Sequence, residues 1–182
     1  MMYLLFSLLC GAVTDYCIYR HYKLPGYPWT WILSLVACST LYFTFDDPVW
    51  VIKGFIFAQM LIIIGYSDAK THEISNWLFL PILLAGLLLF QPIAAFQGLF
   101  LVSLVFLFFA KVTGGAIGGG DVKLIAASGF VLGPAGVVGG TIIGFAILFL
   151  MHPIFYRKRK DKAFAMAPYL GIGCFLAYIL II

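Results

Sequence analysis

The sequence predicts an all-α fold, a polytopic integral membrane bundle of about eight transmembrane helices. Hydrophobic residues make up 64% of the 182 residues, and charged residues only 10%, whereas soluble domains carry about 25% charged residues. The apolar residues gather in runs close to the roughly 20 residues that a spanning helix needs. The basic residues fall between these runs in an alternating pattern that is typical of membrane topology.

The apolar runs divide into eight predicted helices. Gln91-Pro92 interrupts the stretch 77–110, which is too long for one pass, because proline removes a backbone donor and clashes with the preceding turn. Gly133-Pro134-Ala135-Gly136 offers a turn in a second long stretch. Residues 1–10 lack a basic n-region, so we expect a retained first span. The predicted spans are 1–19, 29–45, 49–67, 77–90, 94–111, 122–132, 136–151 and 165–182.

The distribution of Lys and Arg sets the predicted orientation. If the eight spans cross in turn, ten of the eleven basic residues fall at one face, and only Lys53 falls at the other, beside Asp46 and Asp47. Lys and Arg in short loops favour the cytoplasm. We therefore expect both termini outside the cytoplasm and the basic cluster 157–162 inside. A single crossing by residues 122–151 would move that cluster to the wrong side.

Two carboxylates, Asp68 and Asp121, are the strongest functional candidates, because ionisable groups are costly at or inside a membrane. Asp68 follows the apolar run 61–67, and Asp121 follows the glycines 118–120. The predicted topology places both at the same depth on the cytoplasmic face. A lone Asp at a helix end is usually a cap or a solvated charge. We keep that interpretation for Asp15, whose surroundings repeat neither context.

Paired carboxylates can carry out hydrolysis without a metal or a cofactor. Two like charges at short range cannot both ionise at low cost, so the pair shares one proton. One carboxylate can take a proton from water while its protonated partner polarises the scissile carbonyl. Gly118 and Gly120 lack a Cβ, so the backbone near Asp121 can approach another helix or an extended substrate closely.

Three segments resemble those of the type IV prepilin peptidase family. Residues 68–76, DAKTHEISN, resemble its first-aspartate segment, although Ser75 stands where the family usually has proline. Residues 118–124, GGGDVKL, resemble its GxGD motif, which presenilin-type proteases share. Residues 167–173, APYLGIG, are similar to its proline- and glycine-containing last helix. The order and spacing of the three make the combination specific, and the resemblance covers residues 49–182.

The resemblance implies a six-helix GxGD aspartyl peptidase core, 49–182, preceded by a helix pair, 1–48. It implies an aspartic-type endopeptidase, a hydrolase that removes the short basic leader of prepilins or pseudopilins at the cytoplasmic face of the inner (cytoplasmic) membrane. The processed substrates would then serve a type IV pilus or a protein secretion system. Asp68 and Asp121 would be catalytic. The supporting or substrate-binding residues would be Gly118, Gly120, Lys123 and Pro168.

The first cytoplasmic loop departs from many bacterial members. Those members insert a cysteine-bearing region there and also methylate the new N-terminus. Here residues 20–28 are short and contain no cysteine pair. The resemblance therefore implies peptidase chemistry and does not extend to methyltransferase activity. The expected partners are a prepilin-like substrate and the lipid bilayer, without nucleic acid; the oligomeric state stays open.

Two other functions use the same aspartates. A small ion-coupled transporter is one, although transport sites lie near the midplane between repeats and no repeat is visible. A presenilin-like peptidase for other membrane substrates is the second, and the segment after Asp68 disfavours it. We expect no metal, because Asp68 and His72 share helical spacing but no metalloprotease motif surrounds them or Glu73. The glycines 118–120 also match no nucleotide-binding motif.

Overall fold

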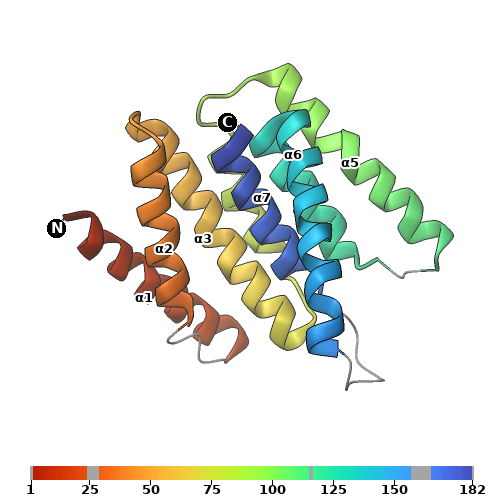
Figure 1. Ribbon diagram of the computed structural model, residues 1–182, viewed down its shortest axis with the longest axis horizontal. Coiled ribbons are helices and arrows are strands. Elements are labelled where there is room, and N and C mark those ends of the chain that lie inside the picture. Colours follow the sequence, from red (N-terminus) through yellow and green to blue (C-terminus); the bar gives the residue numbers. More distant parts are fainter. Residues whose placement is uncertain (1, 24–28, 115–116, 157–164, 182) are drawn as a thin grey trace.

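The protein is a bundle of helices, as predicted (Figure 1). The computed structural model describes residues 2–23, 29–114, 117–156 and 165–181, and in these ranges all regular structure is helical. The elements are α1 (Met2–Tyr22), α2 (Trp29–Thr44), α3 (Pro48–Thr71), the 3₁₀ helix η1 (Asn76–Leu78), α4 (Phe79–Gly86), α5 (Pro92–Val112), α6 (Gly119–Tyr156) and α7 (Ala167–Ile181).

Apolar helices of spanning length make this a helical membrane bundle. Among the described residues, α3, α5 and, taken across its bend at Gly133, the segment Gly119–Met151 of α6 have the length and hydropathy of membrane-crossing helices. Shorter apolar helices cover Trp29–Thr44, Asn76–Gly86 and Ala167–Ile181. The count of eight crossings and their orientation stay predictions. The basic cluster 157–162 and part of the first predicted loop, 24–28, lie outside the described residues.

Local sequence sets several helix boundaries. The Asp47 carboxylate accepts a hydrogen bond of 2.9 Å from the Val49 N–H and caps α3, and Pro48 fits the first turn because its missing N–H is not needed there. The predicted break at Gln91-Pro92 is confirmed, since α5 begins at Pro92 with Gln91 as its N-cap. The helix before it is shorter than predicted, because α4 ends at Gly86 and turns follow.

The predicted turn in the second long stretch, 122–151, involves fewer residues than expected. α6 is assigned as one helix from Gly119 to Tyr156, and only Gly133 (φ 72°, ψ −177°) leaves helical geometry. A positive φ is accessible to glycine at little cost. In Figure 1 the chain turns back at this point, so that residues 119–132 and 134–156 run side by side. The contacts agree with this arrangement. Gly144, in the second half of α6, lies against Leu170 near the start of α7, and Asp121, in the first half, shares a pocket with Asp68, which binds the start of α7.

α7 lies at the centre of the bundle, between α3 and α6 (Figure 1). Tyr178 is fully buried, and its hydroxyl donates a hydrogen bond of 2.7 Å to the Trp50 carbonyl on α3. Glycines allow close packing on the other side, since a Cβ on Gly140 would lie 3.0 Å from the Cα of Cys174. This packing fixes the start of α7 beside the end of α3.

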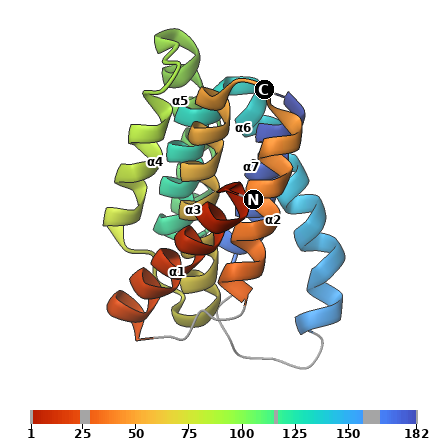
Figure 2. The ribbon, with the colours of Figure 1, turned by 90° about the vertical axis from the view of Figure 1, so that its left-hand side faces the viewer.

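The α1–α2 pair lies at one edge of the bundle in Figure 1 and in front of it in Figure 2, and α1 contacts α2 and α3. A buried polar contact joins the pair to α3, where the Gln59 amide donates a hydrogen bond of 2.8 Å to the Ser34 hydroxyl. Thr14 on α1 donates to the Gln59 side-chain oxygen over a longer 3.4 Å. The division into 1–48 and 49–182 stays a prediction.

Candidate active site

Asp68 and Asp121 lie in one pocket at one end of the bundle. Each side chain is only 7% exposed. The pocket has a volume of about 170 Å³. We call it the aspartate pocket. Its lining residues are Asp68, His72, Ile74, Asn76, Gly118, Gly119, Gly120, Asp121 and Lys123.

Asp68 occupies the last turn of α3 and contacts the start of α7. Its Oδ2 accepts a hydrogen bond of 3.1 Å from the backbone N–H of Ala167. The first N–H groups of a helix have no partner within the helix, so they are free to bind a carboxylate. One turn earlier, a Cβ on Gly65 would lie 3.2 Å from the Cα of Pro168. Pro168 therefore packs against α3 beside Asp68.

The chain ends α3 at His72, directly after this turn. His72 adopts a left-handed conformation with φ 56°, and its N–H donates to the Asp68 carbonyl over 2.9 Å. A residue of this conformation commonly ends a helix. A protonated His72 also attracts the Asp68 carboxylate electrostatically. The same residue thus ends the helix and lines the pocket beside Asp68.

Asp121 lies in the first turn of α6. The Gly118 N–H donates to its carboxylate, and its own N–H donates to the Gly118 carbonyl over 3.0 Å. The partial positive charge of a helix N-terminus favours a carboxylate there. Its Oδ1 is buried and has no hydrogen-bond partner among the described residues. A buried carboxyl oxygen of this kind needs a partner from water or substrate.

The two carboxyl groups interact. Both are buried in one pocket, and two like charges at short range cannot both ionise at low cost. Asp68, His72 and Asp121 line the same pocket. Within the described ranges, however, no three His, Cys, Asp or Glu side chains come close enough together to hold a metal ion.

The remaining contacts fix the segment that follows α3 against the start of α6. The Lys123 ammonium donates a hydrogen bond of 2.8 Å to the Asn76 side-chain oxygen. A Cβ on Gly120 would lie 2.9 Å from Cδ1 of Ile74, so the two segments touch at this glycine. These two contacts join the segment that follows Asp68 to the helix start that carries Asp121.

Comparison with known proteins identifies the family. The model of the type IV leader peptidase family matches residues 55–154, which include both aspartates and more than half of the chain. The chain belongs to the type IV leader peptidase family. It is also 29% identical over 163 residues to the prepilin leader peptidase/N-methyltransferase of Bacillus subtilis (strain 168). That match covers 84% of this chain and 65% of the relative. No solved structure matches this chain.

Five of the six predicted site residues of this leader peptidase family member line the aspartate pocket. The sixth, Pro168, does not line it; it packs behind Asp68 against Gly65. Asn76 and the Ala167 N–H were not predicted as site groups, although both lie in segments that resemble the family. A signal for Asn76 was present in the sequence, because Asn76 is the last residue of the family-like segment that begins at Asp68.

Proposed function

We propose that this member of the type IV leader peptidase family is a membrane-embedded aspartic endopeptidase. Its substrates are type IV prepilins or prepilin-like proteins, from which it removes the short basic leader. The observation that carries the proposal is the pairing of Asp68 and Asp121, two buried carboxyls in one pocket. The printed name of the Bacillus subtilis relative, a prepilin leader peptidase, supports the substrate class.

The two carboxyls divide the work of hydrolysis. Asp68 accepts the Ala167 N–H, which favours its ionised form. Asp121 has a buried oxygen without a donor, which suits a protonated carboxyl that can itself donate. Asp68 takes a proton from water as the water attacks the scissile carbonyl, and Asp121 donates to the carbonyl oxygen. The C–N bond then breaks, the proton held by Asp68 passes to the leaving amine, and Asp121 regains a proton from a hydroxyl of the tetrahedral intermediate.

The position of the pocket suits a substrate that is itself anchored in the membrane. The substrate's hydrophobic helix lies in lipid beside the bundle, and its basic leader stays in the cytoplasm. The scissile bond then meets the aspartates at the cytoplasmic face, the orientation that the basic residues predict. The methyltransferase activity in the relative's name is not part of this proposal, because residues 20–28 contain no cysteine pair.

Prepilin cleavage in membranes tests the two aspartates. Asp68→Asn and Asp121→Asn should each lower the cleavage rate by at least about 10³-fold, because each removes one half of a coupled acid–base pair. The isosteric amide keeps the shape of the pocket, so insertion and expression should match wild type. Lys111→Gln is the matched control, since Lys111 is an exposed residue at the end of α5 that does not line the pocket.

Full cleavage by either aspartate variant would refute the assignment. Cleavage of other single-span membrane proteins at similar rates would favour the presenilin-like alternative. Absence of cleavage, together with substrate-dependent flux in proteoliposomes that Asp68→Asn abolishes, would favour the transporter.

A further inference from the structure

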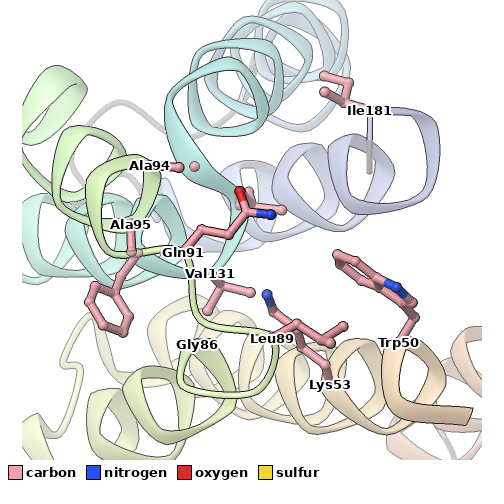
Figure 3. Close-up of a pocket in the computed structure, with 12 residues that line it drawn as sticks. Trp50, Lys53, Gly86, Leu89, Gln91, Ala94, Ala95, Val131 and Ile181 are labelled. Atoms are coloured by element: carbon pink, nitrogen blue, oxygen red, sulfur yellow. The ribbon is translucent and has the colours of Figure 1, made fainter.

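A larger pocket, of about 280 Å³, lies away from the aspartates at the opposite end of the bundle. We call it the lysine pocket (Figure 3). It is formed by α3, the connection from α4 to α5, the turn of α6 at Gly133 and the end of α7. Its lining residues are Trp50, Lys53, Gly86, Leu89, Gln91, Ala94, Ala95, Phe130, Val131, Leu132, Gly133 and Ile181.

Lys53 is the charged residue of this pocket. It is only 5% exposed, and in Figure 3 its side chain reaches into the space between Trp50, Leu89 and Gln91. Its ammonium lies 5.2 Å from the centre of the Trp50 ring. In the part of the chain that the structure describes, no carboxylate pairs with it, and the nearby Asp47 caps α3 instead.

This arrangement is not that of a lysine serving only as an interfacial charge. Such a side chain extends to the membrane surface and keeps its ammonium in water. Lys53 is instead buried, and a buried charge is costly unless it is paired. The cation–π contact with Trp50 stabilises the ammonium in part, but it does not replace a full counter-ion. Among the described residues, the lining of this pocket therefore supplies no negative charge.

Two helix N-termini add positive potential to the same space. α5 begins at Pro92, and its first-turn residue Ala94 lines the pocket. Its N-cap Gln91 makes no side-chain capping bond, so the first N–H groups of α5 are not capped from there. The second half of α6 begins after Gly133, which also lines the pocket. Helix N-termini attract anions, phosphates in particular.

We propose that the lysine pocket binds a phosphate-bearing anion, supplied by the headgroup of an anionic phospholipid. Lys53 pairs with the phosphate, and the Gln91 amide and the start of α5 supply neutral donors. The volume approaches the roughly 300 Å³ of small-molecule sites, which is more than a simple ion needs. Beside the pocket, α5 exposes an apolar face, Ile93, Phe96 and Phe100, along which acyl chains can lie.

Lipid titration of the purified full-length chain tests this site. The melting temperature in a neutral detergent is followed against added phosphatidylglycerol, diacylglycerol with the same acyl chains, and inorganic phosphate. Phosphatidylglycerol should stabilise wild type saturably, and diacylglycerol, which lacks the phosphate, should not. Lys53→Gln should weaken the apparent affinity by about tenfold or more, as expected for loss of a charged hydrogen-bond donor.

Two further variants keep the test decisive. Lys53→Arg keeps the cation and should keep binding, whereas the exposed Lys111→Gln removes a cation elsewhere and should also bind as wild type. If Lys53→Gln fails to fold, Ala94→Leu fills the pocket while Lys53 stays, and it should lose binding. Equal affinity in wild type and Ala94→Leu, or equal stabilisation by diacylglycerol, would overturn the site. Equal stabilisation by inorganic phosphate would keep the anion site but overturn the lipid as its source.

Discussion

The aspartate pocket and the lysine pocket lie near opposite ends of α3. Asp68 and Lys53 are separated by fifteen positions, or about 22 Å along a helix. Both pockets form where other helices begin. At the aspartate pocket the starts of α6 and α7 face carboxylates, and the Ala167 N–H donates directly to Asp68. At the lysine pocket the starts of α5 and of the second half of α6 face a cation.

The two pockets differ in the charge that faces these helix starts, which is negative in one and positive in the other. A helix N-terminus stabilises a carboxylate but adds to the positive potential around a lysine. In the aspartate pocket, backbone N–H groups therefore donate hydrogen bonds to both carboxylates. The buried Oδ1 of Asp121 has no such donor among the described residues and is left for a reaction partner. The lysine pocket is electrostatically incomplete within the described residues. The first arrangement suits chemistry, and the second suits binding of an anion.

The largest effect among the packing variants should come from Gly120. Gly120→Val places side-chain carbons against Ile74, where even a Cβ would lie 2.9 Å from Cδ1. Asp121 should shift, and a misplacement of about 1 Å can lower a rate by about 10²-fold. Prepilin cleavage measures the loss. Gly119→Ala is the matched control, since its Cβ would meet nothing within 4 Å, and it should lose far less. Similar losses in both would show that packing on Ile74 does not position Asp121.

A smaller effect should follow from the contact between Lys123 and Asn76. Lys123→Met and Asn76→Ala each remove the 2.8 Å hydrogen bond that joins η1 to α6. Each should lower kcat/KM for cleavage by up to about tenfold, the range of one charged hydrogen bond. The double variant should lose little more than either single variant, because the two side chains act through one contact. Additive losses would mean that the two residues act separately.

The smallest effect should come from Tyr178 at the other end of the core. Tyr178→Phe removes the hydroxyl that donates to the Trp50 carbonyl and should cost about 1 kcal/mol of stability. Thermal unfolding in detergent measures the change. Cleavage at a temperature well below the melting temperature should stay at the wild-type rate, since Tyr178 does not line the aspartate pocket. A large loss of cleavage without a loss of stability would show that the two ends are coupled.

Much of the fold was predictable because it depends on local chemistry. The apolar runs predicted the helices, and Gln91-Pro92 predicted where α5 begins, because proline cannot continue a preceding helix. The turn in α6 was predicted at Gly133-Pro134-Ala135-Gly136 but needs only Gly133 to leave helical geometry. The length of α4 was overestimated, because the apolar run up to residue 90 gives no signal for a helix that ends at Gly86.

The sequence by itself determined the membrane class of the fold, the helix boundaries set by Pro and Asp, and the motifs that carry Asp68 and Asp121. These features depend on composition and on neighbours in the chain. Only the tertiary structure decided that the Ala167 N–H binds Asp68, that Lys123 binds Asn76, and that Lys53 faces two helix starts. Each of these joins residues far apart in sequence, and packing of whole helices, not local preference, brings them together.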